Sequence, residues 1–148
     1  MIGWAVVPWA PAAGYHRGVS TEPEIPGSEV RLLEIVEPNH TNHYGTLFGG
    51  NALGWMDKAG WLAATRHARR TFVTVATDRI EFKVPVRAGQ LAELVARVTH
   101  EGRTSLTVSV DMFVEDLLIP NSRQLATSGS FVFVAIDEDG HPTPLREP

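Results

Sequence analysis

The sequence predicts an α+β fold in which an antiparallel sheet packs against one long helix. Five segments rich in β-branched and aromatic residues are the expected strands, and short turns join the last four of them. A proline-free segment of Ala, Leu, Trp, Met and Gly between the first two is the expected helix. Consecutive strands joined by short turns pair antiparallel, so we expect the order β-α-β-β-β-β. With 148 residues, 43% of them hydrophobic, the chain predicts one domain.

The elements follow in order along the chain. Residues 1–28 are rich in proline without hydrophobic periodicity, so we expect a poorly ordered tail followed by a domain at 29–145. The first strand is expected at 29–36 and the helix at 51–70. The other strands are expected at 72–84, 91–100, 104–115 and 124–136, because turn residues separate these segments.

Asp57 lies in the middle of the apolar helix. The apolar residues are not confined to one face, so we expect this helix to be buried all round, either by a sheet that wraps around it or by a second chain that covers what the sheet leaves exposed. Aspartate is seldom buried without a partner or a function. Gly54 and Gly60, three residues before and after Asp57, are expected to clear space beside the carboxylate. Either a ligand enters that space, or the glycines serve close packing while a strand N–H satisfies Asp57.

Gly49 and Gly50 precede the expected helix. Free N–H groups at a helix start favour a developing negative charge, which suggests attack on a carbonyl with the oxyanion held there. Asp57 would then act as general base on water or as direct nucleophile. Taken alone, a glycine pair is also compatible with a flexible turn.

Five motifs in order resemble the hotdog-fold acyl-CoA thioesterases of the cytosolic acyl-CoA hydrolase type, which includes the YciA enzymes. They are N-x-x-G-x-x-F-G-G at 42–50, Asp57, D-x-I-x-F-x-x-P-V-x-x-G at 78–89, G-R-T-S at 102–105 and F-V-A-I-D at 133–137. The resemblance implies a sheet of five or six strands wrapped around one long central helix. It also implies hydrolysis of acyl-CoA to a free acid and coenzyme A by Asn42 and Asp57. The two residues would act across a subunit interface in a homo-oligomer, either a dimer or a hexamer built as a trimer of dimers.

Two groups of residues are candidates for binding coenzyme A. The turn at 102–105 offers N–H groups, hydroxyl groups and the Arg103 guanidinium to pantetheine or phosphate, although alone it is equally compatible with an ordinary hairpin. Lys83 and Arg87, which flank Pro85, are further candidates for phosphate contacts. The full set is Gly102, Arg103, Thr104, Ser105, Lys83 and Arg87.

Composition excludes several other classes. A formal charge of −4 argues against a nucleic-acid binder, and the sequence contains no apolar run long enough for a membrane span. The chain start lacks a basic region like that of a secretory signal, so we expect a cytoplasmic protein. The six histidines show no ligand-like pairing and there is no cysteine, so we expect neither a metal nor a redox cofactor.

Two other functions stay open. The first is a hotdog domain that binds acyl-CoA as a sensor or carrier without hydrolysing it. The presence of both Asn42 and Asp57 argues against that function. The second is a hotdog dehydratase or hydratase, which would need a histidine paired with an acid, and His43 is the only candidate close to Asn42.

Overall fold

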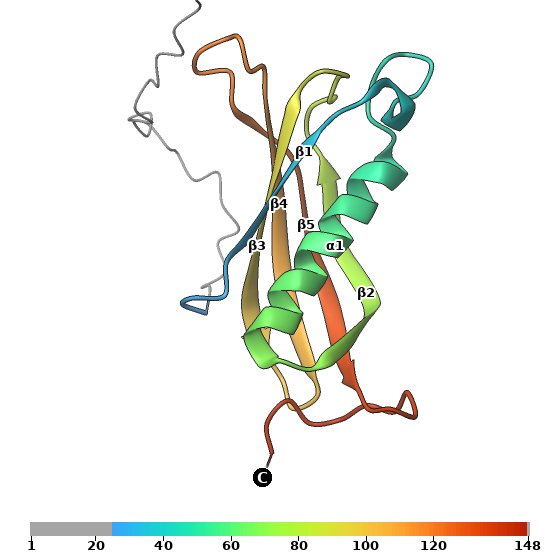
Figure 1. Cartoon of the computed structure of the whole chain (residues 1–148), viewed down its shortest axis with the longest axis vertical. Coiled ribbons are helices and arrows are strands. Elements are labelled where there is room, and N and C mark those ends of the chain that lie inside the picture. The colour runs from blue at the N-terminus through green and yellow to red at the C-terminus, as the bar shows by residue number, and fades with distance from the viewer. Residues whose placement is uncertain (1–24, 148) are drawn as a thin grey trace, which may run out of the picture.

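The computed structural model describes residues 25–147 and contains a five-stranded antiparallel sheet packed against one long helix (Figure 1). The elements in chain order are β1 Val30–Ile35, the 3₁₀ turn η1 Pro38–His40, α1 Gly49–Ala68, β2 Thr71–Phe82, β3 Leu91–Glu101, β4 Ser105–Glu115 and β5 Gln124–Ile136. The strand order in the sheet is β1-β3-β4-β5-β2, with every neighbouring pair antiparallel. The predicted fold class is confirmed, whereas the strand order and η1 were not predicted.

Element boundaries differ from the expected ones by at most two residues, and those of β5 agree with the prediction. The helix begins at Gly49, before the predicted Asn51, because both glycines adopt helical conformation. It ends at Ala68 because Arg69 adopts a left-handed conformation with φ of 55°. Gln90 shapes the turn before β3, since its Oε1 accepts a hydrogen bond from the Arg87 N–H at 2.8 Å.

Residues that precede Glu29, the predicted start of the domain, already form hydrogen bonds with β3. The Ile25 N–H donates to the Val98 carbonyl at 2.8 Å, and the Ser28 hydroxyl accepts from the Val98 N–H at 3.0 Å. Ser28 is buried. The remainder of the predicted tail, residues 1–24, lies outside the described residues.

The core lies between α1 and the inner face of the sheet. The helix contributes Met56, Ala59 and Ala63, which are fully or almost fully buried. Gly60 allows the helix to approach the sheet closely, because a Cβ there would lie 2.9 Å from the Phe133 ring. The apolar side chains of β3, β4 and β5 complete this core.

The sheet of one chain buries only part of α1, so the prediction that the helix is buried all round depends on the second chain that was expected to cover it. The helix buries one face, whereas Gly54 and Lys58 are exposed and the Trp61 side chain is 41% exposed. The sheet covers only the side that faces it, and nothing else within residues 25–147 covers the other side. No helix within residues 25–147 is long and apolar enough to cross a membrane.

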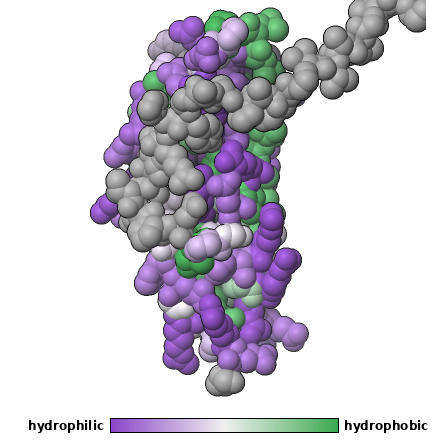
Figure 2. Space-filling view, turned by 90° about the vertical axis from the view of Figure 1, so that its left-hand side faces the viewer, coloured by the Kyte–Doolittle hydropathy of each residue, from purple (hydrophilic) through white to green (hydrophobic). Residues whose placement is uncertain are grey.

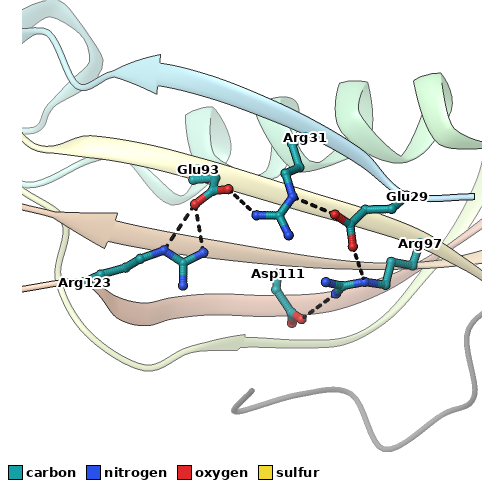
Figure 3. A network of polar contacts seen from close by, with 6 residues as sticks. All are labelled: Glu29, Arg31, Glu93, Arg97, Asp111 and Arg123. Atoms are coloured by element: carbon teal, nitrogen blue, oxygen red, sulfur yellow. Dashed lines mark hydrogen bonds and ion pairs between the residues drawn. The ribbon is translucent and has the colours of Figure 1, made fainter. Parts of the chain in front are cut away.

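The outer face of the sheet carries a network of charged side chains (Figure 3). Glu93 on β3 accepts hydrogen bonds from Arg31 at 2.6 Å and from Arg123 at 2.8 Å. Next to it, Arg97 donates to Glu29 at 2.9 Å and lies 3.9 Å from Asp111. Hydrophilic residues cover most of the described surface visible in Figure 2. The two faces of the sheet therefore differ sharply in chemistry.

Candidate active site

Asp57 is half-buried on α1 and faces β2. Its Oδ1 accepts a hydrogen bond from the Thr74 hydroxyl at 2.6 Å. The neighbouring Lys58 points elsewhere and pairs with Glu34 at 3.2 Å. Within residues 25–147 Asp57 has no ion-pair partner, and the Thr74 hydroxyl that donates to it is a neutral group. Of the two alternatives, the one with a strand N–H is not found within these residues, and a side-chain hydroxyl on β2 takes that place.

The two glycines beside Asp57 have different roles. Gly60 is a packing glycine, because Phe133 fills the space that a Cβ would need. A Cβ at Gly54 would meet no atom within 4 Å, so that side of the helix is open. The prediction that both glycines clear space for the carboxylate is therefore wrong for Gly60, and the space next to Gly54 is open in the single chain.

Asn42 organises the loop between η1 and α1. Its Oδ1 accepts hydrogen bonds from the backbone N–H groups of Tyr44 at 3.0 Å and Thr46 at 3.2 Å. Its amide nitrogen pairs with the Thr46 hydroxyl at 2.9 Å, which leaves the second amide proton available. The His43 ring packs on Tyr44 with 3.9 Å between ring centroids. No hydrogen bond joins Asn42 and Asp57 within the part of the chain that the structure describes.

Gly49 and Gly50 form the exposed start of α1. The residue before them, Phe48, makes no side-chain cap, so no capping side chain occupies the first N–H groups. A helix rises about 1.5 Å per residue, which places Asp57 roughly 10–12 Å along the axis from these glycines. One chain therefore cannot place both the glycine amides and its own Asp57 on the same carbonyl group.

The turn from Gly102 to Ser105 is a tight hairpin beside a cavity. The Gly102 N–H donates to the Ser105 carbonyl at 2.8 Å, and a Cβ on Gly102 would lie 2.9 Å from the Ser105 hydroxyl. The exposed Arg103 lines a cavity of about 380 Å³ together with Gly102, Glu101 and residues 144–146. Thr104 holds the turn to β5, since its carbonyl accepts from the Ala135 N–H at 2.8 Å. The structure thus places an exposed cation next to an open cavity.

Lys83 and Arg87 lie far from this turn. The Lys83 N–H bonds to Ala126 near the start of β5, whereas Thr104 bonds to Ala135 near its end. Nine strand residues at about 3.3 Å each separate these anchor points by roughly 30 Å. Lys83 also pairs with Glu81 at 2.8 Å. The structure does not bring the predicted coenzyme A contacts together within one chain.

One exposed group has the composition of a metal site, although the sequence predicted none. The ligand atoms of Asp137, Asp139 and His141 lie within 4.8 Å of one another. Asp137 Oδ1 already accepts hydrogen bonds from the backbone N–H groups of Asp139 and His141. These hydrogen bonds belong to the turn that follows β5, and the turn explains why the three side chains lie close together.

The family of the chain follows from comparison with known proteins. The Thioesterase superfamily profile matches residues 44–120, and the chain belongs to this superfamily. It is 41% identical over 123 residues to an uncharacterized acyl-CoA thioester hydrolase of Zymomonas mobilis, covering 83% of this chain and 82% of the relative. It is 32% identical over 129 residues to the acyl-CoA thioester hydrolase YciA of Salmonella typhimurium, covering 86% and 97%. The resemblance inferred from the motifs is confirmed, as is the hydrolase class.

Solved structures that are similar to this chain include enzymes of the same kind. A hexameric acyl-CoA thioesterase is 39% identical, with a TM-score of 0.75 and coverage of 79% of this chain and 74% of that one. The acyl-CoA hydrolase of Staphylococcus aureus, solved with butyryl coenzyme A and coenzyme A, is 32% identical with a TM-score of 0.74, covering 79% and 71%. Both neighbours support the hotdog fold predicted from the motifs.

Variants of the Staphylococcus aureus enzyme point to a residue that sequence reasoning missed. An asparagine, an aspartate and a threonine of that enzyme have each been replaced by alanine, and they are separated by 15 and 17 positions. Asn42, Asp57 and Thr74 have the same two spacings. Thr74 carries no motif of its own in a strand rich in threonine. Its hydrogen bond with Asp57 is the signal that distinguishes it.

Proposed function

We propose that this chain hydrolyses acyl-CoA thioesters to a carboxylic acid and coenzyme A at sites built from two copies of the chain. The observation that carries the proposal is the hydrogen bond between Asp57 and Thr74 in a member of the thioesterase superfamily. Relatives that cover most of this chain are named acyl-CoA thioester hydrolases. Coenzyme A enters as part of the substrate, and the reaction proposed here uses neither a metal nor a redox cofactor.

Asp57 supplies the base or the nucleophile in this mechanism. The Thr74 hydroxyl donates a hydrogen bond to the carboxylate and orients it for attack or for proton transfer. The uncapped N–H groups at Gly49 and Gly50 stabilise the oxyanion that forms when the carbonyl is attacked. The spare amide proton of Asn42 orients the attacking water or the carbonyl oxygen.

Two copies are needed because one chain separates these groups. Asp57 lies about 10–12 Å along the helix from Gly49 and Gly50, so a second copy must supply one of the two. Two exposed surfaces offer places for that copy. They are the uncovered side of α1 and the edge strand β2, where Val73 is 40% exposed and Val75 is 55% exposed. Some relatives of known structure are hexameric, which supports an oligomer of this kind.

The nucleotide of coenzyme A is assigned first to the Gly102–Ser105 turn. Arg103 is exposed, borders a cavity of about 380 Å³ and has no ion-pair partner within residues 25–147. A guanidinium in this setting binds phosphate well because its N–H groups match the phosphate oxygens. Lys83 and Arg87 lie at the other end of the sheet, so they contact the same nucleotide only if it belongs to a site shared with another copy.

The alternative functions have weaker support. An acyl-CoA binder without turnover has no use for a carboxylate held by Thr74, and the matching spacing of Asn42, Asp57 and Thr74 favours catalysis. A dehydratase would need His43 paired with an acid, and the ring of His43 packs on Tyr44 instead. The cytoplasmic location expected from the sequence stays a prediction.

Subunit mixing tests the composite site directly. The Asn42→Ala and Asp57→Asn variants are first shown to be inactive alone in hydrolysis of short, medium, long and aromatic acyl-CoAs. They are then mixed under conditions that exchange subunits. We expect partial recovery of activity, because a mixed pair contains one site with both residues intact. Recovery that stays absent after verified exchange would show that each site is built from one chain.

Substitution of Arg103 tests the nucleotide assignment. Arg103→Ala should raise KM for acyl-CoA and weaken inhibition by coenzyme A, with a smaller change in kcat, because the contact is remote from the thioester. Short thioesters without the nucleotide should be hydrolysed as before. If acyl-CoA and the truncated thioesters lost activity equally, Arg103 would have a structural or chemical role instead.

A further inference from the structure

The loop that carries Asn42 ends at the start of α1. The Asn42 N–H donates to the Thr46 carbonyl at 2.8 Å, and the Phe48 N–H donates to the His40 carbonyl at 3.0 Å, so the loop is a short antiparallel ladder. Gly49, the first residue of the helix, follows Phe48 directly. Figure 1 shows η1 and this loop beside the start of α1. Asn42 and the uncapped N–H groups of the helix are therefore supplied by the same part of one copy.

Asn51 connects the first turn of α1 to the base of this loop. It is half-buried, and its amide nitrogen Nδ2 donates to the His40 carbonyl at 2.9 Å. The same carbonyl accepts from the Phe48 N–H, so both of its lone pairs are used. Only the nitrogen of the Asn51 amide can donate to a carbonyl, so this contact also fixes the orientation of the side chain.

Trp55 supports the same attachment from the next turn of the helix. It lies four residues after Asn51 and therefore on the same face of α1. Its ring meets the His40 ring edge-on, with the centroids 5.1 Å apart and the planes at 90°. The His40 Nδ1 accepts a hydrogen bond from the Glu37 N–H at 3.1 Å, which holds the ring to η1. Two successive turns of α1 thus contact the backbone and the ring of one residue.

The Asn51 contact spans a flexible joint between the loop and the helix. On the loop side, the side chain and the backbone of Asn42 both bond to Thr46, so the loop moves as a unit. On the helix side, α1 begins with the glycine pair at 49–50, and glycine restricts the backbone less than any other residue. The backbone at the glycines therefore leaves the angle between loop and helix open. The hydrogen bond from Asn51 to the His40 carbonyl fixes that angle.

We propose that Asn51 is a positioning residue that holds Asn42 in place relative to the N–H groups of residues 49–50. The inference rests on the proposed thioesterase function and assigns Asn51 to the half of the composite site that Asn42 supplies. Asp57 of the second copy supplies the other half. Asn51 acts through the His40 carbonyl and does not contact the substrate.

Replacement of Asn51 by leucine tests this role. Asn51→Leu keeps a side chain of similar size and removes the donor to the His40 carbonyl. We expect kcat to fall by about 10–100-fold with little change in KM for acyl-CoA, because a displaced Asn42 no longer stabilises the transition state. The matched control is Ser122→Ala, which removes another side-chain contact that holds a loop, since the Ser122 hydroxyl accepts from the Asp116 N–H at 3.0 Å. The control should keep kcat close to the wild-type value.

The leucine variant is expected to fold. The Leu47 N–H donates to the Val86 carbonyl at 2.7 Å, so the loop stays attached to the segment after β2 when the Asn51 contact is removed. Thermal unfolding checks each variant, and Asn51→Ala replaces Asn51→Leu if the latter does not fold. A folded variant with unchanged kcat would overturn the proposal.

Subunit mixing locates the defect within the composite site. A pair of Asn51→Leu and Asp57→Asn subunits contains one site in which the Asn42 half and Asp57 are both intact. We therefore expect activity several-fold above that of either variant alone. A pair of Asn51→Leu and Asn42→Ala subunits contains no such site, so its activity should not exceed that of Asn51→Leu.

The other outcomes of the mixing experiment overturn the proposal. Recovery with Asn42→Ala instead of Asp57→Asn would assign Asn51 to the Asp57 half of the site. Recovery with neither variant, while Asn42→Ala and Asp57→Asn still complement each other, would show a general structural defect. If that last pair failed to recover, the composite site itself would be wrong, and the kcat values of Asn51→Leu and Ser122→Ala would decide the role of Asn51. A wild-type protein that hydrolyses no acyl-CoA would overturn the proposed function and this inference together.

Discussion

Asp57 and Glu93 are carboxylates on opposite sides of the same sheet, and they have different partners. Asp57 lies over the inner face and accepts one hydrogen bond from the neutral Thr74 hydroxyl at 2.6 Å. Glu93 lies on the outer face and accepts charged hydrogen bonds from Arg31 at 2.6 Å and Arg123 at 2.8 Å. Two guanidinium groups pair with Glu93, whereas a neutral hydroxyl group holds Asp57.

The partners of the carboxylates on the outer face set their pKa values. Burial tends to raise the pKa of Glu93, but the hydrogen bonds from Arg123 and Arg31 outweigh it and hold the pKa below its usual range. Asp111 shows the opposite balance, because burial raises its pKa and Arg97 at 3.9 Å offsets burial only in part. The outer network therefore couples charge to folding, whereas Asp57 has only the neutral contact on which its proposed role rests.

The largest effect on turnover is expected when the Asp57 carboxylate is replaced by its amide. Asp57→Asn should lower kcat by about 10²–10⁴, the range for a positioned acid or base, while folding and coenzyme A binding persist. Glu93→Gln is the matched control and should keep kcat close to the wild-type value. Steady-state kinetics on one acyl-CoA and thermal unfolding of both variants supply the measurement. Near wild-type turnover by Asp57→Asn would remove Asp57 from the mechanism.

A smaller effect is expected from Thr74→Val, which keeps the side-chain shape and removes the hydroxyl. Loss of one neutral hydrogen bond of about 0.5–1.5 kcal/mol corresponds to roughly a 2–10-fold decrease in kcat. Thr74→Ser keeps the hydroxyl and should retain most of the activity. If the serine and valine variants lost activity equally, packing at Thr74 rather than its hydroxyl would be what matters.

The last effect is expected in stability and leaves catalysis unchanged. Glu93→Gln should lower the free energy of unfolding at pH 7 by about 1–2 kcal/mol, between the values for exposed and buried ion pairs. Because the pKa of Glu93 is lowered in the folded state, its contribution is present above the usual glutamate value of 4.5 and is lost as the pH falls through the folded pKa. Denaturant unfolding of both proteins at pH 7 and pH 3 measures this. A stability difference that stays constant with pH would contradict the role of the charge.

Local sequence patterns were sufficient to predict the elements. Alternating residues placed β4 within one residue of its observed start, and the glycine pair marked the start of α1. Both signals arise from backbone conformation and side-chain period within a few residues. The motif around Asn42 and the isolated carboxylate at Asp57 identified the family for the same reason, since their spacing is a property of the chain alone.

The contacts between distant elements were decided only by the tertiary structure. The strand order places β2 at the sheet edge and brings Thr74 onto Asp57, 17 residues away in the sequence. The same packing turns Gly60 towards Phe133 and sets Arg103 and Lys83 at opposite ends of the sheet. The sequence by itself singled out Asn42 and Asp57 as candidates for chemistry, but not Thr74. Only packing decided which of them meet, because strand register and helix orientation depend on burial summed over the whole core.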